Sequence, residues 1–428
     1  MHLGTRLKKL REAKGLSQKE ISHGIVSTSH YSNIESGRFD PSNEVLQLLA
    51  NKLEVPTSYF HKIYEDHPDL QVLLIQYEKL LNTNEKEVQQ FLTKHVNKFT
   101  YISSIKQEIL FNLLKYLELV RFAEITLAQT HYTSEIKIIP PDYIDQASNS
   151  ILEKYTFVTG IYQYFNREYQ KSIRYFLDSL HLTKDEVLSA KLNYNISLAF
   201  YHSYDYGTAL VYAKQALTLY MHFHDWEKCG HCYNLIAALY MEQHKMEDAK
   251  HYIEKGSSII TDKKSKLYAD VCHNQAYFFY LEKEYMQALK EINKSLEILQ
   301  QYQSKNAFNA MKLKVEIVLQ LKDFKTLHTF LPKLKETVSS EIEQDQLTYL
   351  EATIYYFMGE YEEYEQKMRS CTAGFRMNKD WKSLKTAAHH FSNYFAEQKK
   401  YKNAYTYQEL CILSYSNMTF ELKGGEEK

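Results

Sequence analysis

Residues 18–37, QKEISHGIVSTSHYSNIESG, decide the fold at the N-terminal end of the chain. Ser17 precedes this stretch and Glu20 follows three places later, which is a capping-box pattern for the start of a helix. Gly24 then allows the chain to turn, and Ser27 is a favourable N-cap for a second helix. The stretch therefore predicts a short helix, a turn and a second short helix.

The second of these helices is expected to have one apolar and one polar face. Tyr31 and Ile34 lie three residues apart and belong to the core side. The other side chains are short and polar and point to solvent or to a nucleic acid: Thr28, Ser29, His30, Ser32 and Asn33. Such groups suit major-groove recognition, because long acids there would repel phosphate. The alternative is a small helical module whose polar face is merely solvated.

Composition and charge limit the class of protein. The 428 residues are 44% apolar, with 12 Gly, 6 Pro and a net charge of −1, which favours a globular chain of long helices over disorder or sheets. Residues 1–64 contain nine Lys and Arg against six acids, a modest basic patch that suits phosphate contact. No stretch is apolar enough for a membrane span or a signal peptide, so we expect a cytoplasmic protein with reduced cysteines.

The N-terminal stretch resembles the Cro/repressor-type (XRE) helix-turn-helix family. The matching residues are Leu7, Arg11, Gly15, Leu16, Ser17, Gln18, Ile21, Val26, Ser27, Ser32, Ile34, Glu35, Gly37, Pro41, Ser42, Leu46, Leu49, Ala50, Leu53, Glu54 and Val55. The resemblance implies a DNA-binding domain at residues 1–64 in which Arg11 pairs with Glu35. It also implies that phosphates and base edges meet Gln18, Ser27 and the face from Thr28 to Asn33. The turn is one residue shorter than usual, which is similar to the peptide-sensing branch of the family.

Between the N-terminal domain and the middle of the chain, the helix signals are weaker. The apolar runs Val72–Ile75 and Ile109–Leu114 predict helices, and the pair Pro140–Pro141 ends the region. We interpret residues 65–142 as a linker helix and divergent helical repeats.

Beyond Pro141 the chain repeats itself. A small or apolar residue that opens the second helix of each pair recurs every 37 to 40 positions: Ser172, Ala209, Ala249, Ala288, Leu327, Tyr364 and Ala404. A usually small residue lies twelve places before each of these, a spacing that lets two antiparallel helices pack closely. We predict an all-α fold with a helical solenoid at residues 143–416 and a flexible tail at 417–428.

These spacings resemble the tetratricopeptide repeat, with somewhat longer helices. The resemblance implies a right-handed solenoid whose concave face is lined by the first helix of every repeat. An extended peptide in that groove needs its backbone amides satisfied, and asparagine both donates and accepts. Candidate peptide-binding residues on the first helices are Asn195, Tyr201, Asn234, Asn274, Tyr277 and Asn309. The alternative for each asparagine is an ordinary exposed helix face.

Arg121 is a separate candidate for peptide binding. It is the one arginine in an apolar helical stretch, so its guanidinium could hold a peptide carboxylate. Pairing with Glu124, three residues later, is the competing interpretation.

Two clusters of reactive residues have ordinary interpretations. Residues 229–232 read CGHC, like a redox dithiol, but they open a repeat helix rather than follow a strand. The nearby histidines His222, His224 and His231 join these cysteines in no standard zinc spacing. Since no phosphate-binding glycine loop or nucleophile elbow is present either, we expect no enzyme activity, cofactor or metal.

Together the two parts resemble the RNPP family of peptide-sensing Gram-positive regulators, and the length and repeat number are most similar to its NprR group. The resemblance implies quorum sensing: a short signalling peptide in the groove controls a homo-oligomer, dimer or tetramer, and its grip on a double-stranded DNA operator. It also implies a response regulator of the sporulation phosphorelay as a second partner. The alternatives are a Rap-like phosphorelay inhibitor and a phage lysis/lysogeny regulator of related build.

Overall fold

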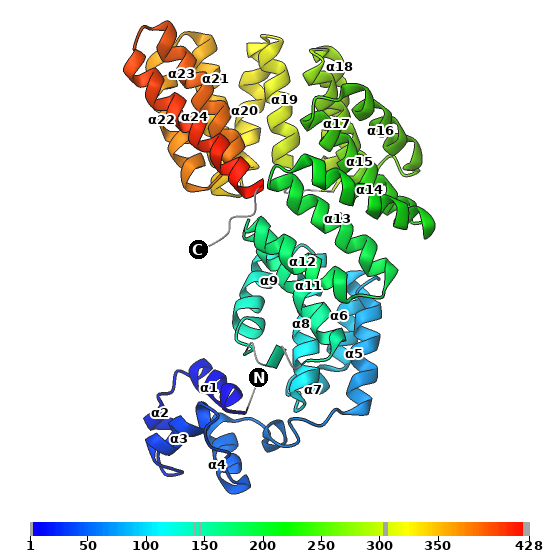
Figure 1. The fold of residues 1–428 in the computed structure, drawn as a ribbon, viewed down its shortest axis with the longest axis vertical. Coiled ribbons are helices and arrows are strands. Elements are labelled where there is room, and N and C mark those ends of the chain that lie inside the picture. The colour runs from blue at the N-terminus through cyan, green and yellow to red at the C-terminus, as the bar shows by residue number, and fades with distance from the viewer. Residues whose placement is uncertain (1–2, 141–142, 145–146, 303–306, 423–428) are drawn as a thin grey trace. The chain divides into compact units, whose positions relative to one another are not determined.

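The computed structural model describes residues 3–140, 143–144, 147–302 and 307–422 (Figure 1). In these ranges every regular element is a helix, so the predicted all-α class is confirmed. Contacts divide the chain into two compact units. Unit 1 comprises the residues up to Arg167 together with Asp178–Thr183, and unit 2 comprises Glu168–Leu177 and the residues from Lys184 onward. Within the described ranges, no helix has both the length and the apolar character of a bilayer span.

Unit 1 begins with a small helical domain, here called the head: α1 (Leu3–Ala13), α2 (Gln18–Ser22), α3 (Thr28–Glu35), α4 (Asn43–Leu53) and a 3-10 turn (Thr57–Phe60). Seven apolar side chains with at most 1% exposure form the centre of its core: Leu7, Ile21, Tyr31, Ile34, Leu49, Ala50 and Leu53. Gly4 lies where α1 meets α3, and a Cβ there would overlap the carbonyl oxygens of Ile34 and Glu35. The predicted helix, turn and helix are confirmed.

The rest of unit 1 continues as helices: α5 (Pro68–Leu80), α6 (Glu85–Lys94), α7 (Val96–Phe99), α8 (Ile105–Arg121), α9 (Ile125–His131), a π-helical turn (Tyr132–Ile136) and α11 (Asn149–Phe165). Leu74, Tyr77 and Val88 are fully buried against Leu114 of α8. The next helix, α12 (Tyr169–Leu182), is divided between the two units.

Arg6 fastens the head to α8. Its fully buried guanidinium donates from Nε to Glu108 Oε2 at 3.0 Å, and its other nitrogens donate to the carbonyl oxygens of Tyr59 at 2.9 Å and Ile102 at 3.0 Å. The Tyr59 ring lies 4.5 Å from the guanidinium carbon, and its hydroxyl donates to Glu108. A buried charge is tolerated only when it is paired and hydrogen-bonded, so the members of this network depend on one another.

Unit 2 is a stack of helical hairpins (Figure 1). After α12, its helices are α13 (Glu186–His202), α14 (Tyr206–His222), α15 (Trp226–Glu242), α16 (Met246–Ile259), α17 (Lys266–Leu281), α18 (Tyr285–Gln301), α19 (Phe308–Gln320), α20 (Phe324–Glu336), α21 (Glu341–Met358), α22 (Tyr361–Met377), α23 (Trp381–Glu397) and α24 (Tyr401–Leu422). From α13 onward each odd-numbered helix packs against the even-numbered helix that follows it. The predicted array of helix pairs is confirmed.

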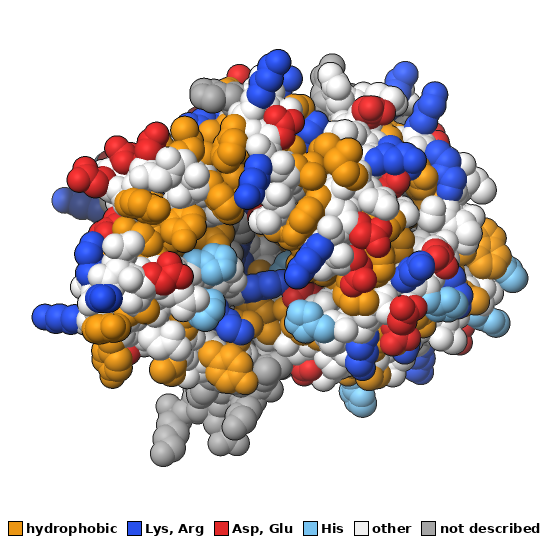
Figure 2. All heavy atoms as spheres, turned by 90° about the horizontal axis from the view of Figure 1, so that it is seen from above, with side chains coloured by type: hydrophobic (Ala, Val, Ile, Leu, Met, Phe, Trp, Pro, Cys, Tyr) orange, Lys and Arg blue, Asp and Glu red, His pale blue; other side chains and the backbone are white. Residues whose placement is uncertain are grey.

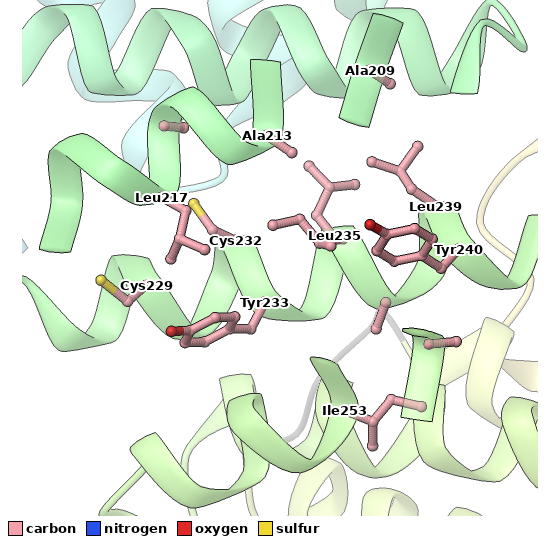
Figure 3. Close-up of a cluster of buried hydrophobic side chains, with 14 of the residues drawn as sticks. Ala209, Ala213, Leu217, Cys229, Cys232, Tyr233, Leu235, Leu239, Tyr240 and Ile253 are labelled. Atoms are coloured by element: carbon pink, nitrogen blue, oxygen red, sulfur yellow. The ribbon is translucent and has the colours of Figure 1, made fainter. Parts of the chain in front are cut away.

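Small residues let the two helices of a hairpin approach closely. Ser197 Oγ donates to the carbonyl oxygen of Ala209 at 2.8 Å, and Ser392 Oγ donates to that of Ala404 at 2.9 Å. Both pairs stand at the twelve-residue offset that the repeat pattern predicts. Figure 3 shows the apolar side chains that fill the space around the neighbouring helices, among them Ala213 of α14.

Cys229 and Cys232 lie in the same buried cluster (Figure 3). Burial raises the pKa of Cys229 to about 11 and also raises the pKa of Cys232. A thiol with a raised pKa carries little thiolate at neutral pH, so it is a poor nucleophile and a poor metal ligand. Cys229 and Cys232 therefore pack in the apolar core of the repeats.

Arg6→Met should destabilise unit 1, because it leaves the Glu108 carboxylate buried without its cation. We expect the full chain to lose about 3–5 kcal/mol of unfolding free energy, measured by chemical denaturation, with faster hydrogen exchange in α1. Lys8→Met, on the exposed side of α1, is the matched control and should change stability by less than about 0.5 kcal/mol. Equal effects of the two substitutions would contradict the role of Arg6.

Candidate nucleic-acid interface and groove

Local hydrogen bonds fix the two short helices of the head. Ser17 Oγ accepts the Glu20 N–H at 3.2 Å and Glu20 Oε2 accepts the Ser17 N–H at 2.7 Å, so the predicted capping box is confirmed. Ser27 Oγ accepts the His30 N–H at 3.2 Å and caps α3. Gly24 in the turn has a φ of +79°, a conformation that glycine adopts more readily than other residues.

A buried ion pair orients α3 against α1. Arg11 donates from Nε to Glu35 Oε1 at 2.6 Å and from Nη2 to Oε2 at 3.2 Å, which is the pair that the family resemblance implies. The same carboxylate accepts the side-chain amide of Gln18 at 2.7 Å. Burial alone would raise the pKa of Glu35, but the hydrogen bonds from Arg11 and Gln18 outweigh it and hold the pKa below its ordinary value. The Gln18 amide is thus turned to Glu35.

The residues of α3 and its N-cap that are predicted to contact nucleic acid lie on the polar side of the helix. They are exposed or half-buried without exception: Ser27, Thr28, Ser29, His30, Ser32 and Asn33. The His30 ring packs edge-on against Phe39, with the ring centroids 4.4 Å apart, and Phe39 is itself 47% exposed. Sequence reasoning missed Phe39, because no repeating pattern marks it. The face offers hydroxyl, amide and imidazole groups to base edges and phosphates.

In unit 2, two of the predicted peptide-binding asparagines contact each other. Asn274 of α17 donates from Nδ2 to Oδ1 of Asn234 on α15 at 2.8 Å and to the Asn234 carbonyl oxygen at 3.1 Å. Asn195 on α13 is half-buried, and Asn309 is exposed in the first turn of α19. Hydrogen bonds from Asn274 to Asn234 thus connect the first helices of two adjacent repeats.

The predicted tyrosines Tyr201 and Tyr277 lie near a carboxylate that sequence reasoning missed. The Tyr201 hydroxyl donates to Glu242 Oε1 at 3.4 Å, and burial together with the charge of Glu242 raises the pKa of Tyr277. Glu242 also forms an ion pair with Lys382 at 2.5 Å, which joins α15 to α23 across 140 residues of sequence. On the face seen in Figure 2 the surface is hollowed near its centre, and cationic and histidine side chains border the hollow.

Arg121 has a different setting from the one its sequence suggests. It is exposed at the end of α8, and its Nη2 donates to the Thr83 carbonyl oxygen at 3.1 Å. Among the described residues, Arg121 forms no ion pair with Glu124. Arg121 belongs to unit 1, and the other six predicted peptide-binding residues belong to unit 2.

Glu35→Gln tests the ion pair through its pH dependence. Because the folded pKa of Glu35 is lowered, the carboxylate stabilises the fold above its ordinary pKa, and this contribution is lost as the pH falls through the folded value. The loss of unfolding free energy caused by Glu35→Gln should be about 1–3 kcal/mol near neutral pH and should shrink below a pH of about 4. Denaturation curves at a series of pH values measure it, with exposed Glu44→Gln as the control. A loss that is constant over this range would contradict the assignment.

Comparison with known proteins finds a family match for the head and a relative that is similar over nearly the whole chain. Residues 7–60 match the helix-turn-helix family. The sequence is 22% identical over 422 residues to the transcriptional activator NprA of Geobacillus stearothermophilus, covering 93% of this chain and 99% of the relative.

Two solved structures share the fold at low sequence identity. One is a Rap protein complexed with competence and sporulation factor, with a TM-score of 0.69, 13% identity, and coverage of 82% of this chain and 99% of that chain. The other is NprR in complex with its cognate peptide NprX, with a TM-score of 0.65, 17% identity, and coverage of 81% of this chain and 98% of that chain. In its helix-turn-helix match and its similarity to NprA over nearly the whole chain, this chain resembles the RNPP family of regulators.

Proposed function

We propose that this chain is a quorum-sensing transcription regulator rather than an enzyme. A short signalling peptide, bound in the groove of the repeats, controls its oligomeric state and its binding to an operator. The observation that carries this proposal is the similarity to the transcriptional activator NprA over nearly the whole chain, which includes the head and the repeats together. The fold shared with the NprR–NprX complex supports a peptide as the ligand of the repeats.

The head supplies the DNA contacts in this proposal. Ser29, His30 and Asn33 lie on the polar face of α3 and can donate to and accept from base edges in the major groove. Basic residues elsewhere in the head serve phosphate contacts, which give affinity without sequence selectivity. Two heads of a dimer would contact half-sites about 34 Å apart, so the arrangement of protomers decides whether both can bind.

The groove supplies the peptide contacts. The side-chain amides of Asn234 and Asn274 can exchange their mutual hydrogen bond for bonds to a peptide backbone, because an amide both donates and accepts. Tyr201 and Tyr277 offer apolar ring surface beside them. Arg121, which ends a helix of unit 1, remains a proposed contact for a peptide carboxylate.

A cytoplasmic location follows from this function, because the operator lies in the cytoplasm of a bacterium. There, the five cysteines would stay reduced. The protein is proposed to form a homo-oligomer, a dimer or a tetramer, and the peptide is proposed to change this oligomeric state.

A Rap-like protein that binds a response regulator through its repeats is the second candidate. Its support is the fold shared with the Rap protein complex. The two candidates differ in the function of the head. The first requires the head to bind operator DNA, whereas a Rap-like inhibitor does not.

The deciding experiment selects operator sequences from a random duplex DNA library with the full-length protein, in the presence and absence of a pooled heptapeptide library. Gel shift and sizing of the selected complexes then measure affinity and oligomeric state. The proposal expects a selected sequence whose affinity changes at least about tenfold with peptide, which corresponds to about 1.4 kcal/mol of coupling. If no duplex is selected in either state, while a response regulator is retained on the immobilised protein, the second candidate replaces the first.

Asn33→Ala should weaken binding to the selected operator about ten- to a hundredfold, since one base contact carries about 1–3 kcal/mol of discrimination. Binding to unrelated duplex should hardly change, because phosphate contacts remain. Asn43→Ala at the start of α4 is the control of the same type, and gel-shift titration measures both. A uniform loss on every duplex would show that Asn33 supports the fold of the head instead.

Asn274→Leu should abolish the response to peptide while leaving operator affinity without peptide unchanged. The substitution removes an amide that sits between two repeats but keeps a side chain of similar size. Fluorescence anisotropy of operator DNA across a peptide titration gives the response. An unchanged response in Asn274→Leu would exclude Asn274 from the peptide site.

A further inference from the structure

A cavity of about 250 Å³ opens between α21, α22 and α23 in unit 2. Its walls are aromatic: the rings of Tyr356 and Tyr364 lie 5.2 Å apart, and those of Tyr364 and Tyr394 lie 4.8 Å apart, centroid to centroid. Met368, which is fully buried, also lines it. None of the predicted peptide-binding residues takes part in this cavity.

The polar groups of the cavity are few. The hydroxyl of Tyr349 and Nδ1 of His390 are hydrogen-bonded at 2.6 Å. Glu397 is exposed, and within the described part of the chain its carboxylate has neither an ion pair nor a hydrogen bond. The cavity thus combines aromatic walls with one carboxylate that is not neutralised.

The other carboxylate beside the cavity is already satisfied. Glu365 accepts the Tyr394 hydroxyl at 3.2 Å and forms ion pairs with Arg369 at 3.1 Å and Lys400 at 3.0 Å. The two cations are thereby held on Glu365, and Glu397 is left as the acceptor available to a ligand.

The repeat pattern puts this cavity on the same side of the solenoid as the predicted groove. His390 stands fourteen residues before Ala404, as Asn274 does before Ala288. Equal offsets in a repeat place side chains on the same face of equivalent helices. The cavity is therefore a continuation of the groove into the last repeats.

The offsets also identify an internal counterpart of Glu397. Glu397 stands seven residues before Ala404, and Glu242 stands seven before Ala249. Glu242 receives the Lys382 ammonium at 2.5 Å and the Tyr201 hydroxyl at 3.4 Å. At this position of the repeat, a carboxylate near tyrosines already binds an ammonium group of the protein itself.

We propose that the cavity binds a cation of the signalling peptide, either the ammonium or guanidinium of a side chain or the N-terminal ammonium. Glu397 accepts its hydrogen bonds, and the faces of Tyr356 and Tyr394 surround it, because aromatic faces attract cations. This inference rests on the proposed function, since it assumes that a peptide occupies the groove. It adds a preference of the peptide: a positive charge where the chain meets the last repeats.

Methyl NMR of the full-length chain reads the cavity directly. Methionine methyl groups are labelled with ¹³C, and Met368 is assigned through Met368→Leu. The probes are Nα-acetyl-lysine methylamide, its uncharged isostere Nα-acetyl-norleucine methylamide, and norleucine methylamide with a free α-amino group. The first probe tests a side-chain ammonium, and the third tests a terminal ammonium.

At least one charged probe should shift the Met368 signal at a concentration about tenfold lower than the uncharged probe, a difference of about 1.4 kcal/mol. Glu397→Gln should remove this preference, whereas Glu363→Gln, an exposed change on α22, should retain it. An uncharged probe that binds as well as the charged ones, a preference that survives Glu397→Gln, or silence of all three probes overturns the inference.

The failure of this inference and that of the proposed function can be distinguished. If peptides still control operator binding in Glu397→Gln with no change in their charge preference, the cation pocket is refuted and the regulator stands. If operator binding ignores every peptide while the Met368 signal retains a Glu397-dependent preference for a charged probe, the regulator is refuted and the pocket stands.

Discussion

Close contact between the two helices of each hairpin is the interaction on which unit 2 depends. A serine or alanine at the crossing lets the backbones approach until a hydroxyl such as that of Ser197 reaches the carbonyl oxygen of Ala209. The same contact recurs near the end of the array between Ser392 and Ala404. Because the crossing is the same in both repeats, residues at equal offsets face the same side. This regularity turns a one-dimensional sequence pattern into a continuous lining for the groove.

Buried charge has the corresponding role in unit 1. Arg6 is enclosed by Glu108, Tyr59 and backbone carbonyl oxygens. These contacts attach α1 to α8, so the head is held by buried side chains as well as by the connecting chain. Arg11 and Glu35 fix α3 against α1 in the same way. Removing one partner of either pair would leave an uncompensated charge in the interior, so each pair holds its elements in one arrangement. A head held in this way presents the polar face of α3 in a defined orientation relative to α8.

In unit 2, two acidic residues at equivalent positions of the repeat differ in their partners. Glu242 forms an ion pair with Lys382. Burial and the charge of Glu242 raise the pKa of Tyr206 and of Tyr277. Glu397 has the equivalent position in a later repeat without a cation of its own among the described residues. The same position of the repeat thus holds one carboxylate that is paired with a cation of the protein and one that is not. The unpaired carboxylate is the one that can select a ligand by its charge.

The sequence by itself determined the elements whose causes are local. Capping by Ser17 and Ser27 depends on residues three apart, and the hairpins depend on small residues twelve apart, so both could be predicted. The pair between Arg11 and Glu35 came from a family resemblance and is confirmed, and the similarity to NprA supports the resemblance itself. Only the tertiary structure decided the contacts of Arg6 with Glu108 and of Glu242 with Lys382, and the exposed position of Arg121. The partners in those pairs are 102 and 140 residues apart, and what brings them together is the path of the stacked helices, which no local pattern encodes.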